Sequence, residues 1–212
     1  LVQQIELAQG TTDVSQYLQG WVPTTERSTL WVTANPYARS LQHLAYLARY
    51  PYGCVEQTTS ATRPLLYVSE LVNDVDPTLT GGGTVGDMVL SGINRILAMQ
   101  TPSGGFGYWP GATEPVGWGS AYATHMLLDA QKLKYPVPQD RLNDALTWMS
   151  TELNKFESRQ GRDDMYTDSA EAYMHYVLSV AGKGRKARVQ KMVDALAERA
   201  KKKALTGEEQ ER

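Results

Sequence analysis

The chain has 212 residues, of which 42% are hydrophobic and 21% are charged, and its formal net charge at pH 7 is −2. This length is enough to bury the core of one ordinary domain with a short extension at each end. The balanced charge gives no electrostatic reason to expect a nucleic acid partner, and no apolar run approaches the roughly 20 residues that span a bilayer, so we expect no membrane contact by this domain.

Residues 1–33 contain short segments with the composition of β-strands, of which residues 28–33 (Ser-Thr-Leu-Trp-Val-Thr) are the clearest. We interpret this stretch as a linker or as the end of a preceding β domain. The chain also begins with Leu1 in place of methionine, which suggests a fragment of a longer protein. Other domains of that full-length protein are therefore expected partners.

After residues 1–33 the sequence has the patterns of α-helices. Asn35 followed by a proline predicts the start of a helix, and Tyr50 before Pro51 predicts its end. Apolar residues at three- and four-residue spacing predict further amphipathic helices. These helices are expected near residues 56–73, 119–134 and 167–181 and in the segments that begin at Val85, Leu142 and Val189.

About seven helices separated by Gly, Pro and Asp residues predict an all-α domain over residues 34–204, and residues 205–212 are expected to form a disordered tail. Helix pairs joined by such loops suggest stacked helical hairpins. The spacing of the helices does not distinguish a bundle, a solenoid and a closed ring of hairpins.

The single cysteine, Cys54, lies in the string Tyr-Pro-Tyr-Gly-Cys-Val-Glu-Gln at residues 50–57. A thiol at position i and the Gln57 carboxamide at i+3 face the same side of the first turn of a helix, so the sulfur can displace ammonia and form an internal thioester. The helix dipole favours a thiolate at this end of a helix, whereas Glu56 opposes it locally. Gly53 gives the backbone the freedom for a sharp turn into the string.

Residues 51–57 resemble the thioester signature of the alpha-2-macroglobulin and complement family, and the Tyr50-Pro51 pair before them resembles its bacterial branch. The likeness extends over about residues 28–178. Its further matches are Thr58-Thr59-Ser60, Pro64, the glycine-aromatic loop at residues 100–110 (Gln-Thr-Pro-Ser-Gly-Gly-Phe-Gly-Tyr-Trp-Pro) and the helix start at residues 118–122.

The resemblance implies an all-α fold, an α/α toroid of helical hairpins, with a short β-type N-terminal extension. Residues 100–110 also resemble loops of terpene cyclases and prenyltransferase β subunits, which share this barrel of helices. Seven helices would make an incomplete ring. Either the chain is truncated after Arg212 or this version of the domain is smaller.

The function that the resemblance implies is a broad-spectrum trap for proteases. In the family, a protease cuts a bait region located elsewhere in the full protein, and the thioester becomes exposed. Gln57 would then acylate a lysine amine of the captured protease while Cys54 leaves as a thiol, and Glu56 is a residue of the same motif. Such a protein is an inhibitor and not an enzyme.

An exposed activated acyl group would hydrolyse, so the bond needs a cover. Tyr50 and Tyr52 are the expected shields by resemblance to bacterial relatives, and Tyr108 and Trp109 are candidates for a second wall. The resemblance also implies a periplasmic location, with an anchor to the inner membrane on another part of the full-length protein.

The expected acceptor of the acyl group follows from the absence of a histidine at the position that complement-like members use. Complement-like members use a downstream histidine to form an acyl-imidazole before hydroxyl attack, whereas macroglobulin-like members can lack it and favour amines. The corresponding stretch, about residues 156–166, contains no histidine, and His175 comes too late in the chain. We therefore expect acyl transfer to lysine amines of a target protease.

Two alternatives stay open: a toroid enzyme related to terpene cyclases or prenyltransferases, and an interaction module that lacks the thioester. The enzyme would need an acidic cluster or a metal site, and no spacing among the three histidines and Cys54 resembles a zinc site. His43 and His125 are interpreted as half-exposed helix residues, and residues 74–76 as a solvated loop and not a calcium site. No metal and no cofactor is expected.

Overall fold

The computed structural model describes the backbone of residues 5, 9–20, 22, 24–25, 32, 53–75, 83–158 and 165–210. It also describes the side chains of these residues, apart from those of residues 18, 68–75, 156–158, 165–168, 199 and 202–210. The chain divides into two compact units, Leu1–Ala38 and Arg39–Arg212. The first unit contains a short 3₁₀-helix, η1 (Ser15–Leu18). The β-type segment predicted at residues 28–33, apart from Val32, and the helix predicted to end by Tyr50 lie outside the described residues.

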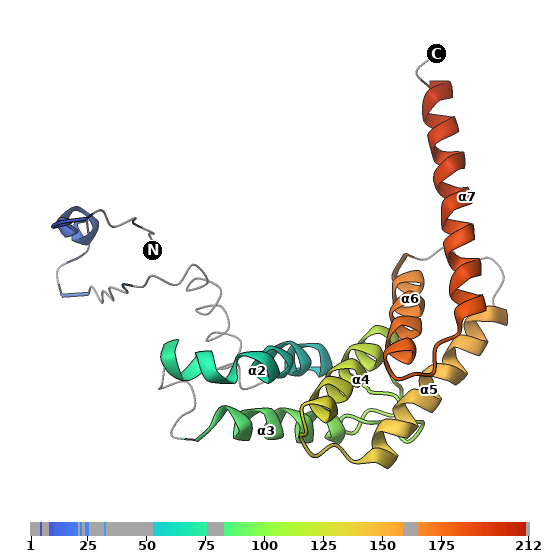
Figure 1. The fold of residues 1–212 in the computed structure, drawn as a ribbon, viewed down its shortest axis with the longest axis horizontal. Helices are drawn as coiled ribbons and strands as arrows, with labels where there is room; N and C mark the ends of the chain where they lie inside the picture. Colours follow the sequence, from blue (N-terminus) through green and yellow to red (C-terminus); the bar gives the residue numbers. More distant parts are fainter. Residues whose placement is uncertain are drawn as a thin grey trace. The chain divides into compact units, whose positions relative to one another are not determined.

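The second unit is built from α-helices, and the described residues contain no β-strand. In chain order the helices are α2 (Val55–Val75), α3 (Val85–Ala98), α4 (Gly117–Lys132), α5 (Gln139–Ser158), α6 (Met165–Val180) and α7 (Lys186–Gln210) (Figure 1). The all-α prediction is confirmed. None of the described helices is long and apolar enough to cross a membrane.

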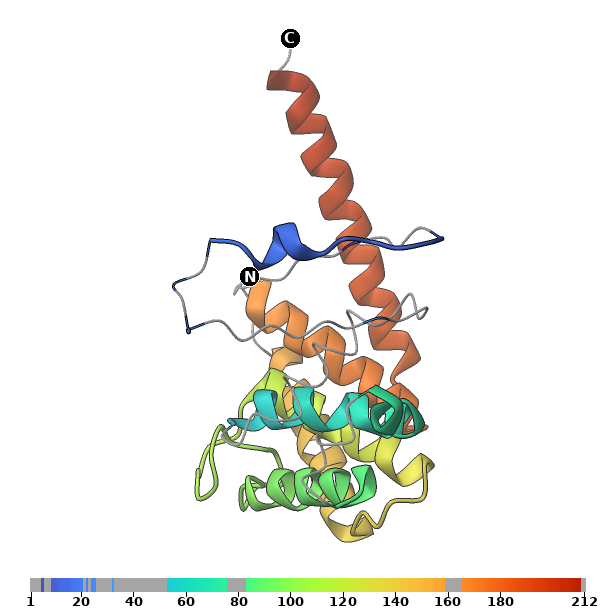
Figure 2. The same ribbon diagram turned by 90° about the vertical axis from the view of Figure 1, so that its left-hand side faces the viewer.

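Helices α2, α4 and α6 follow one another side by side and run in the same sense (Figure 2). Ser60 in α2 lies 3.3 Å from the hydroxyl of Tyr122 in α4, and Arg63, one turn later, contacts Asp129, which is further along α4. Ring contacts between α4 and α6 keep the same order; they pair Trp118 with Tyr173 and His125 with Tyr176.

Helix α3 returns antiparallel to α2. Arg95, near the end of α3, reaches the Gly53 carbonyl just before α2, whereas Gly92, earlier in α3, packs against Thr62, later in α2. Helix α5 contacts both α4 and α6. This alternation agrees with stacked helical hairpins, and closure of the hairpins into an α/α toroid stays a prediction.

The core lies between these helices, and burying each of its large side chains contributes about 1.5–3 kcal/mol relative to exposure. Val55, the first residue of α2, is part of it, so the core sets the position of the neighbouring Cys54. The largest fully buried side chains are those of Phe106, Ile93, Ile96, Met99, Met126, Leu127, Leu142, Met149, Leu153, Met174, Leu178 and Val55.

The connection between α3 and α4 contains the glycine-aromatic stretch at residues 100–110. The Ser120 hydroxyl of α4 accepts from the Phe106 N–H at 2.8 Å and donates to the Phe106 carbonyl at 3.1 Å. Gly104 has a φ of +100°, and a Cβ there would lie 2.6 Å from the Asp144 carbonyl oxygen of α5, so a side chain does not fit. The loop is thereby fixed against α4 and α5.

Helix α7 is tied at its start to α5 and α6. Arg185, just before α7, donates from Nη1 to Asn154 Oδ1 at 2.7 Å, and Arg188 donates from Nη2 to Glu171 Oε1 at 2.8 Å. The helix continues to Gln210. The tail expected at residues 205–212 stays a prediction. The domain boundaries at residues 34 and 204 stay predictions.

Candidate functional site

The first turn of α2 brings the cysteine and the glutamine of the motif together. Cys54 is the residue just before α2, the N-cap position, and Gln57 is the third residue of the helix. The backbone N–H of Cys54 donates a hydrogen bond to Oε1 of Gln57, with an N···O distance of 3.1 Å. A third-position side chain that bonds back to the N-cap N–H is one half of a capping box. The Gln57 carboxamide is therefore folded back onto the residue that carries the sulfur.

The residues of the motif differ in exposure. Cys54 is half-buried, Glu56 is half-buried and Gln57 is exposed. Gln57 is thus the most exposed of these three residues.

Gly53 fits where a larger residue would not. It is buried, and its carbonyl oxygen accepts hydrogen bonds from Thr58 Oγ1 and from Arg95 Nη2 of α3, each at 3.2 Å. A Cβ at this position would lie 2.9 Å from Gln57 Cβ and 3.1 Å from the Thr58 backbone nitrogen. The lack of a side chain at Gly53 lets Gln57 fold back toward Cys54.

Val55 ties the first turn of α2 to the glycine-aromatic loop. Its N–H donates to the Tyr108 carbonyl oxygen at 3.1 Å, which satisfies a first-turn N–H that has no partner inside the helix. Its side chain is fully buried and packs on Gly119, where a Cβ would lie 2.8 Å from Val55 Cγ1. The Thr59 hydroxyl donates to the Val55 carbonyl at 2.7 Å. The start of α2 is therefore held from the loop, from α4 and from within α2.

The structure describes only two of the four aromatic residues that are expected to cover the bond. Tyr50 and Tyr52 lie outside the described residues. Tyr108 and Trp109 lie in the loop that contacts Val55, and their side chains are 44% and 54% exposed. Their role as a second wall stays a prediction.

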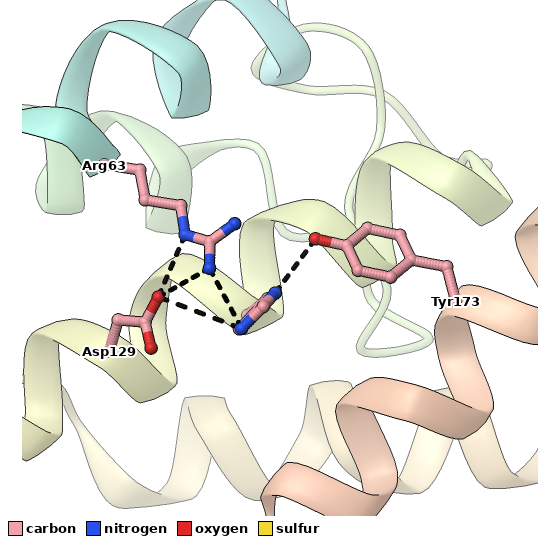
Figure 3. Close-up of polar contacts among 4 residues, drawn as sticks. Arg63, Asp129 and Tyr173 are labelled. Carbon is pink, nitrogen blue, oxygen red and sulfur yellow. Dashed lines mark hydrogen bonds and ion pairs between the residues drawn. The ribbon is translucent and has the colours of Figure 1, made fainter.

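A second polar cluster joins α2, α4 and α6 (Figure 3). Arg63 donates from Nε to Asp129 Oδ2 at 2.9 Å, and its Nη2 lies 3.0 Å from His125 Nε2. His125 Nδ1 lies 3.0 Å from the Tyr173 hydroxyl. Because a guanidinium group only donates, Nε2 of His125 must accept, so the neutral ring carries its proton on Nδ1 and donates it to Tyr173.

Burial keeps this cluster neutral apart from the ion pair of Arg63 and Asp129. Burial, and then the charge of Arg63, lowers the pKa of His125, and Asp129 only partly opposes the shift. Burial raises the pKa of Tyr173 to about 12. His125 is 6% exposed, so the expectation of a half-exposed helix residue is wrong, because α2 and α6 cover the ring. The sequence analysis did not identify this cluster.

His175 is buried on α6, with Nε2 3.9 Å from Glu171 Oε1. The side chains of residues 156–168, which include the stretch compared with the catalytic histidine of complement-like proteins, lie outside those described. Within the described part of the chain, no group of three or more His, Cys, Asp or Glu side chains could hold a metal ion.

Comparison with known families gives one match that spans the site. The family model described as the A-macroglobulin TED domain, where TED stands for the thioester domain, matches residues 30–169. This range contains Cys54, Gln57 and the glycine-aromatic loop.

Individual relatives agree with the family match. The alpha-2-macroglobulin of Escherichia coli K12 is 33% identical over 133 residues, which are 59% of this chain and 8% of that protein. The crystal structure of Salmonella alpha-2-macroglobulin reacted with methylamine aligns with a TM-score of 0.61 and 27% identity over 74% of this chain and 11% of that one. Trypsin-activated alpha-2-macroglobulin from Escherichia coli aligns with a TM-score of 0.57 and 26% identity over 70% of this chain and 11% of that one. The chain thus spans about a tenth of the length of these relatives.

Proposed function

Because this chain belongs to the A-macroglobulin TED domain family, we propose that it is the thioester domain of a protease-trapping inhibitor, in which Cys54 and Gln57 form an internal thioester. One observation carries the proposal: the hydrogen bond from the Cys54 N–H holds the Gln57 carboxamide at the residue that supplies the sulfur. Glu56 is the remaining residue of the motif.

Formation of the bond needs no cofactor. The Cys54 thiolate attacks Cδ of Gln57, the C–S bond forms and the C–N bond breaks. The nitrogen takes up the proton that the thiol lost and leaves as ammonia. The product is lighter than the unmodified chain by about 17 Da, the mass of ammonia.

In the transfer to a target, nitrogen is the attacking atom and sulfur is the leaving atom, at the same carbon of Gln57. An amine attacks Cδ of Gln57, a C–N bond forms, the C–S bond breaks, and a proton from the amine restores the Cys54 thiol. Each thioester is used once. The domain therefore acts as a stoichiometric reagent and not as an enzyme.

Lysine amines of a captured protease are the proposed acceptors. Residues 156–166 contain no histidine that could form an acyl-imidazole, which favours direct attack by an amine. Two relatives support this choice. The Salmonella protein was reacted with methylamine, which is an amine, and the Escherichia coli protein was activated by trypsin, which is a protease.

The remaining parts of the proposal concern the full-length protein. Cleavage of a bait region elsewhere in that protein triggers exposure of the thioester, and Tyr50 and Tyr52 shield it until then. The domain occupies residues 34–204, after a linker or the end of a preceding β domain at residues 1–33, and its helical hairpins form an α/α toroid. Its location is the periplasm, with an inner-membrane anchor on another part of the protein.

Intact mass before and after methylamine treatment tests the proposal. The protein is expected to start about 17 Da below its sequence mass, and then to gain about 31 Da at Gln57 together with one new titratable thiol. The Cys54→Ala variant is the control and should show neither change. A wild-type protein of full sequence mass that takes up no methylamine would contradict the proposal.

A further inference from the structure

We propose that the peptide group between Gly53 and Cys54 stabilises the oxyanion that forms at Gln57, and that Arg95 strengthens this peptide group from its far side. The inference rests on the proposed thioester function of Cys54 and Gln57. It assigns a role to a charged residue of α3 that lies outside the motif.

Both ends of this one peptide group are hydrogen-bonded. Its N–H, which belongs to Cys54, donates to Gln57 Oε1 at 3.1 Å. Its carbonyl oxygen, which belongs to Gly53, accepts from Arg95 Nη2 and from Thr58 Oγ1, each at 3.2 Å. Because the peptide bond is conjugated, a cation at the carbonyl oxygen draws electron density from the nitrogen and makes its N–H a stronger donor.

The atom that accepts this hydrogen bond is the one that becomes negative during the reaction. When sulfur or an amine attacks Cδ of Gln57, the electron pair of the C=O bond moves onto Oε1. When the tetrahedral intermediate collapses, that pair re-forms the C=O bond, and ammonia leaves in the first step or the Cys54 thiolate in the second. Preorganised donors of this kind are worth about 10²- to 10³-fold in rate each.

Arg95 acts through the peptide group, which makes it a positioning residue. Its side chain is half-buried, where charges are screened less than in water. Linked hydrogen bonds strengthen one another by about 10–30% each, so its effect must be smaller than that of the direct donor. We expect a loss of about 3- to 10-fold in rate when its charge is removed, a fraction of the full effect of an oxyanion donor.

The test compares Arg95→Met and Arg95→Lys with the matched control Arg141→Met in the intact protein. Arg141 also donates from Nη2 to a backbone carbonyl, that of Leu97 at 2.9 Å, but it does not touch the Gly53–Cys54 peptide group. Thioester content is first measured by intact mass, and the rate of thiol release by methylamine is then measured per thioester. Arg95→Met should slow this rate by about 3- to 10-fold, Arg95→Lys should recover part of it, and Arg141→Met should stay within about twofold.

A spectroscopic readout separates polarisation from simple tethering. The infrared band of the thioester carbonyl, isolated as the difference before and after methylamine treatment, should move to higher frequency in Arg95→Met because the bond to Oε1 weakens. Thr58→Val removes a neutral donor to the same carbonyl and should shift the band by less in the same direction. This variant also covers the case in which Arg95→Met does not fold.

The outcomes distinguish failure of the proposed role of Arg95 from failure of the proposed thioester function. A reactive wild type together with an Arg95→Met variant of unchanged rate and unchanged band overturns the inference and leaves the proposed function standing. Equal slowing in Arg95→Met and Arg141→Met also overturns it, since that result marks a general loss of packing. A wild type without a thioester overturns the proposed function itself.

Discussion

Helices α2 and α3 begin with the same hydrogen bond from the N-cap N–H to the third-position side chain, and with different side chains. At the start of α3, the Asp87 N–H donates to Thr84 Oγ1 at 3.1 Å, and the Thr84 N–H donates to Asp87 Oδ2 at 2.8 Å, which completes a capping box. At the start of α2, Cys54 and Gln57 occupy the same two positions, and the Cys54 N–H donates to Gln57 Oε1 at 3.1 Å.

The difference between the two helix starts is chemical. A threonine hydroxyl is a weak nucleophile and a carboxylate is a poor acyl donor, so the pair at the start of α3 only caps the helix. A cysteine can supply a thiolate, and a neutral carboxamide can lose ammonia. The cap geometry brings two side chains within reach of each other, and their chemical identity decides whether a covalent bond can follow.

Cys54→Ser should have the largest effect on the comparison, because it turns the start of α2 into a Ser-x-x-Gln capping box like that of α3. We expect complete loss of the mass deficit and of methylamine uptake. The free energy of unfolding should change by no more than about 1 kcal/mol, since serine is a good N-cap. Intact mass and urea unfolding measure the two effects, and a variant that still takes up methylamine would disprove the assignment of the sulfur.

Copying the reactive pair into α3 tests whether the pair suffices. The double variant Thr84→Cys with Asp87→Gln should form no second thioester, because among the described residues the start of α3 has no counterpart of the Arg95, Tyr108 and Gly119 contacts that together hold the start of α2. Intact mass should show a single ammonia loss. A second loss of about 17 Da would show that the local pair alone is enough.

Gly53→Ala should have the next largest effect. The added Cβ would lie 2.9 Å from Gln57 Cβ, so the carboxamide or the turn must move. We expect thioester content to fall by about tenfold or more, because acyl transfer is sensitive to small misplacements, and stability to fall by about 1–3 kcal/mol. The matched control is Gly86→Ala in α3, where the nearest atom is Thr84 Oγ1 at 3.4 Å, an ordinary contact. Full thioester content in Gly53→Ala would contradict the proposed close fit.

Thr84→Ala should affect stability and leave the thioester unchanged. Loss of an N-cap hydroxyl typically costs about 1 kcal/mol. Denaturant unfolding should therefore show a lower midpoint, and intact mass should show the same ammonia loss as in the wild type. A change in thioester content would mean that the two helix starts are coupled.

Acid should act on the His125 cluster, where α2 meets α4, and on the start of α3 in separate pH ranges, with the smallest effect of the series. Folding lowers the pKa of His125 below 6.5, so the folded state binds fewer protons than the unfolded state there. The contribution of the neutral ring, which faces Arg63, Asp129 and Tyr173, is full above pH 6.5 and is lost as the pH falls toward the folded pKa. Urea midpoints at pH 7.5 and 5.5 should differ more in the wild type than in His125→Gln, and equal differences would contradict the prediction.

The start of α3 responds at lower pH. Hydrogen bonds from Thr84 lower the pKa of Asp87 below 3.8, so the stability that this carboxylate supplies is present above 3.8 and is lost as the pH falls through the lowered pKa. Gln57 does not titrate, so the corresponding bond at α2 has no such dependence. An NMR titration of Asp87 should show its pKa rising toward 3.8 in Thr84→Ala.

The helix positions could be predicted because they depend on local periodicity. The predicted start at Val85 is the observed start of α3, where Val85, Val89 and Ile93 are all buried. The helix predicted from Val189 begins three residues earlier, at Lys186. Such small errors are normal at helix ends, where apolar spacing carries little information.

The polar cluster could not be predicted in the same way. Arg63 of α2 and His125 of α4 are far apart in the sequence, and each alone has the pattern of a surface helix residue. A signal exists in retrospect, since Ser60 and Arg63 share the spacing of Tyr122 and His125 and meet them in that order. Equal spacing of polar residues on two helices shows which helix faces can pair, but not that these two helices are neighbours.

The amino-acid sequence by itself determined the all-α class and the proximity of Cys54 and Gln57, because helical periodicity and the i to i+3 relation of these two residues are local properties of the chain. The tertiary structure alone decided what surrounds that pair. Arg95 reaches Gly53, and Tyr108 reaches Val55, only because the packed core aligns α3 and its following loop with the start of α2. Periodicity identifies the buried face of a helix, whereas its partner depends on how the whole core packs.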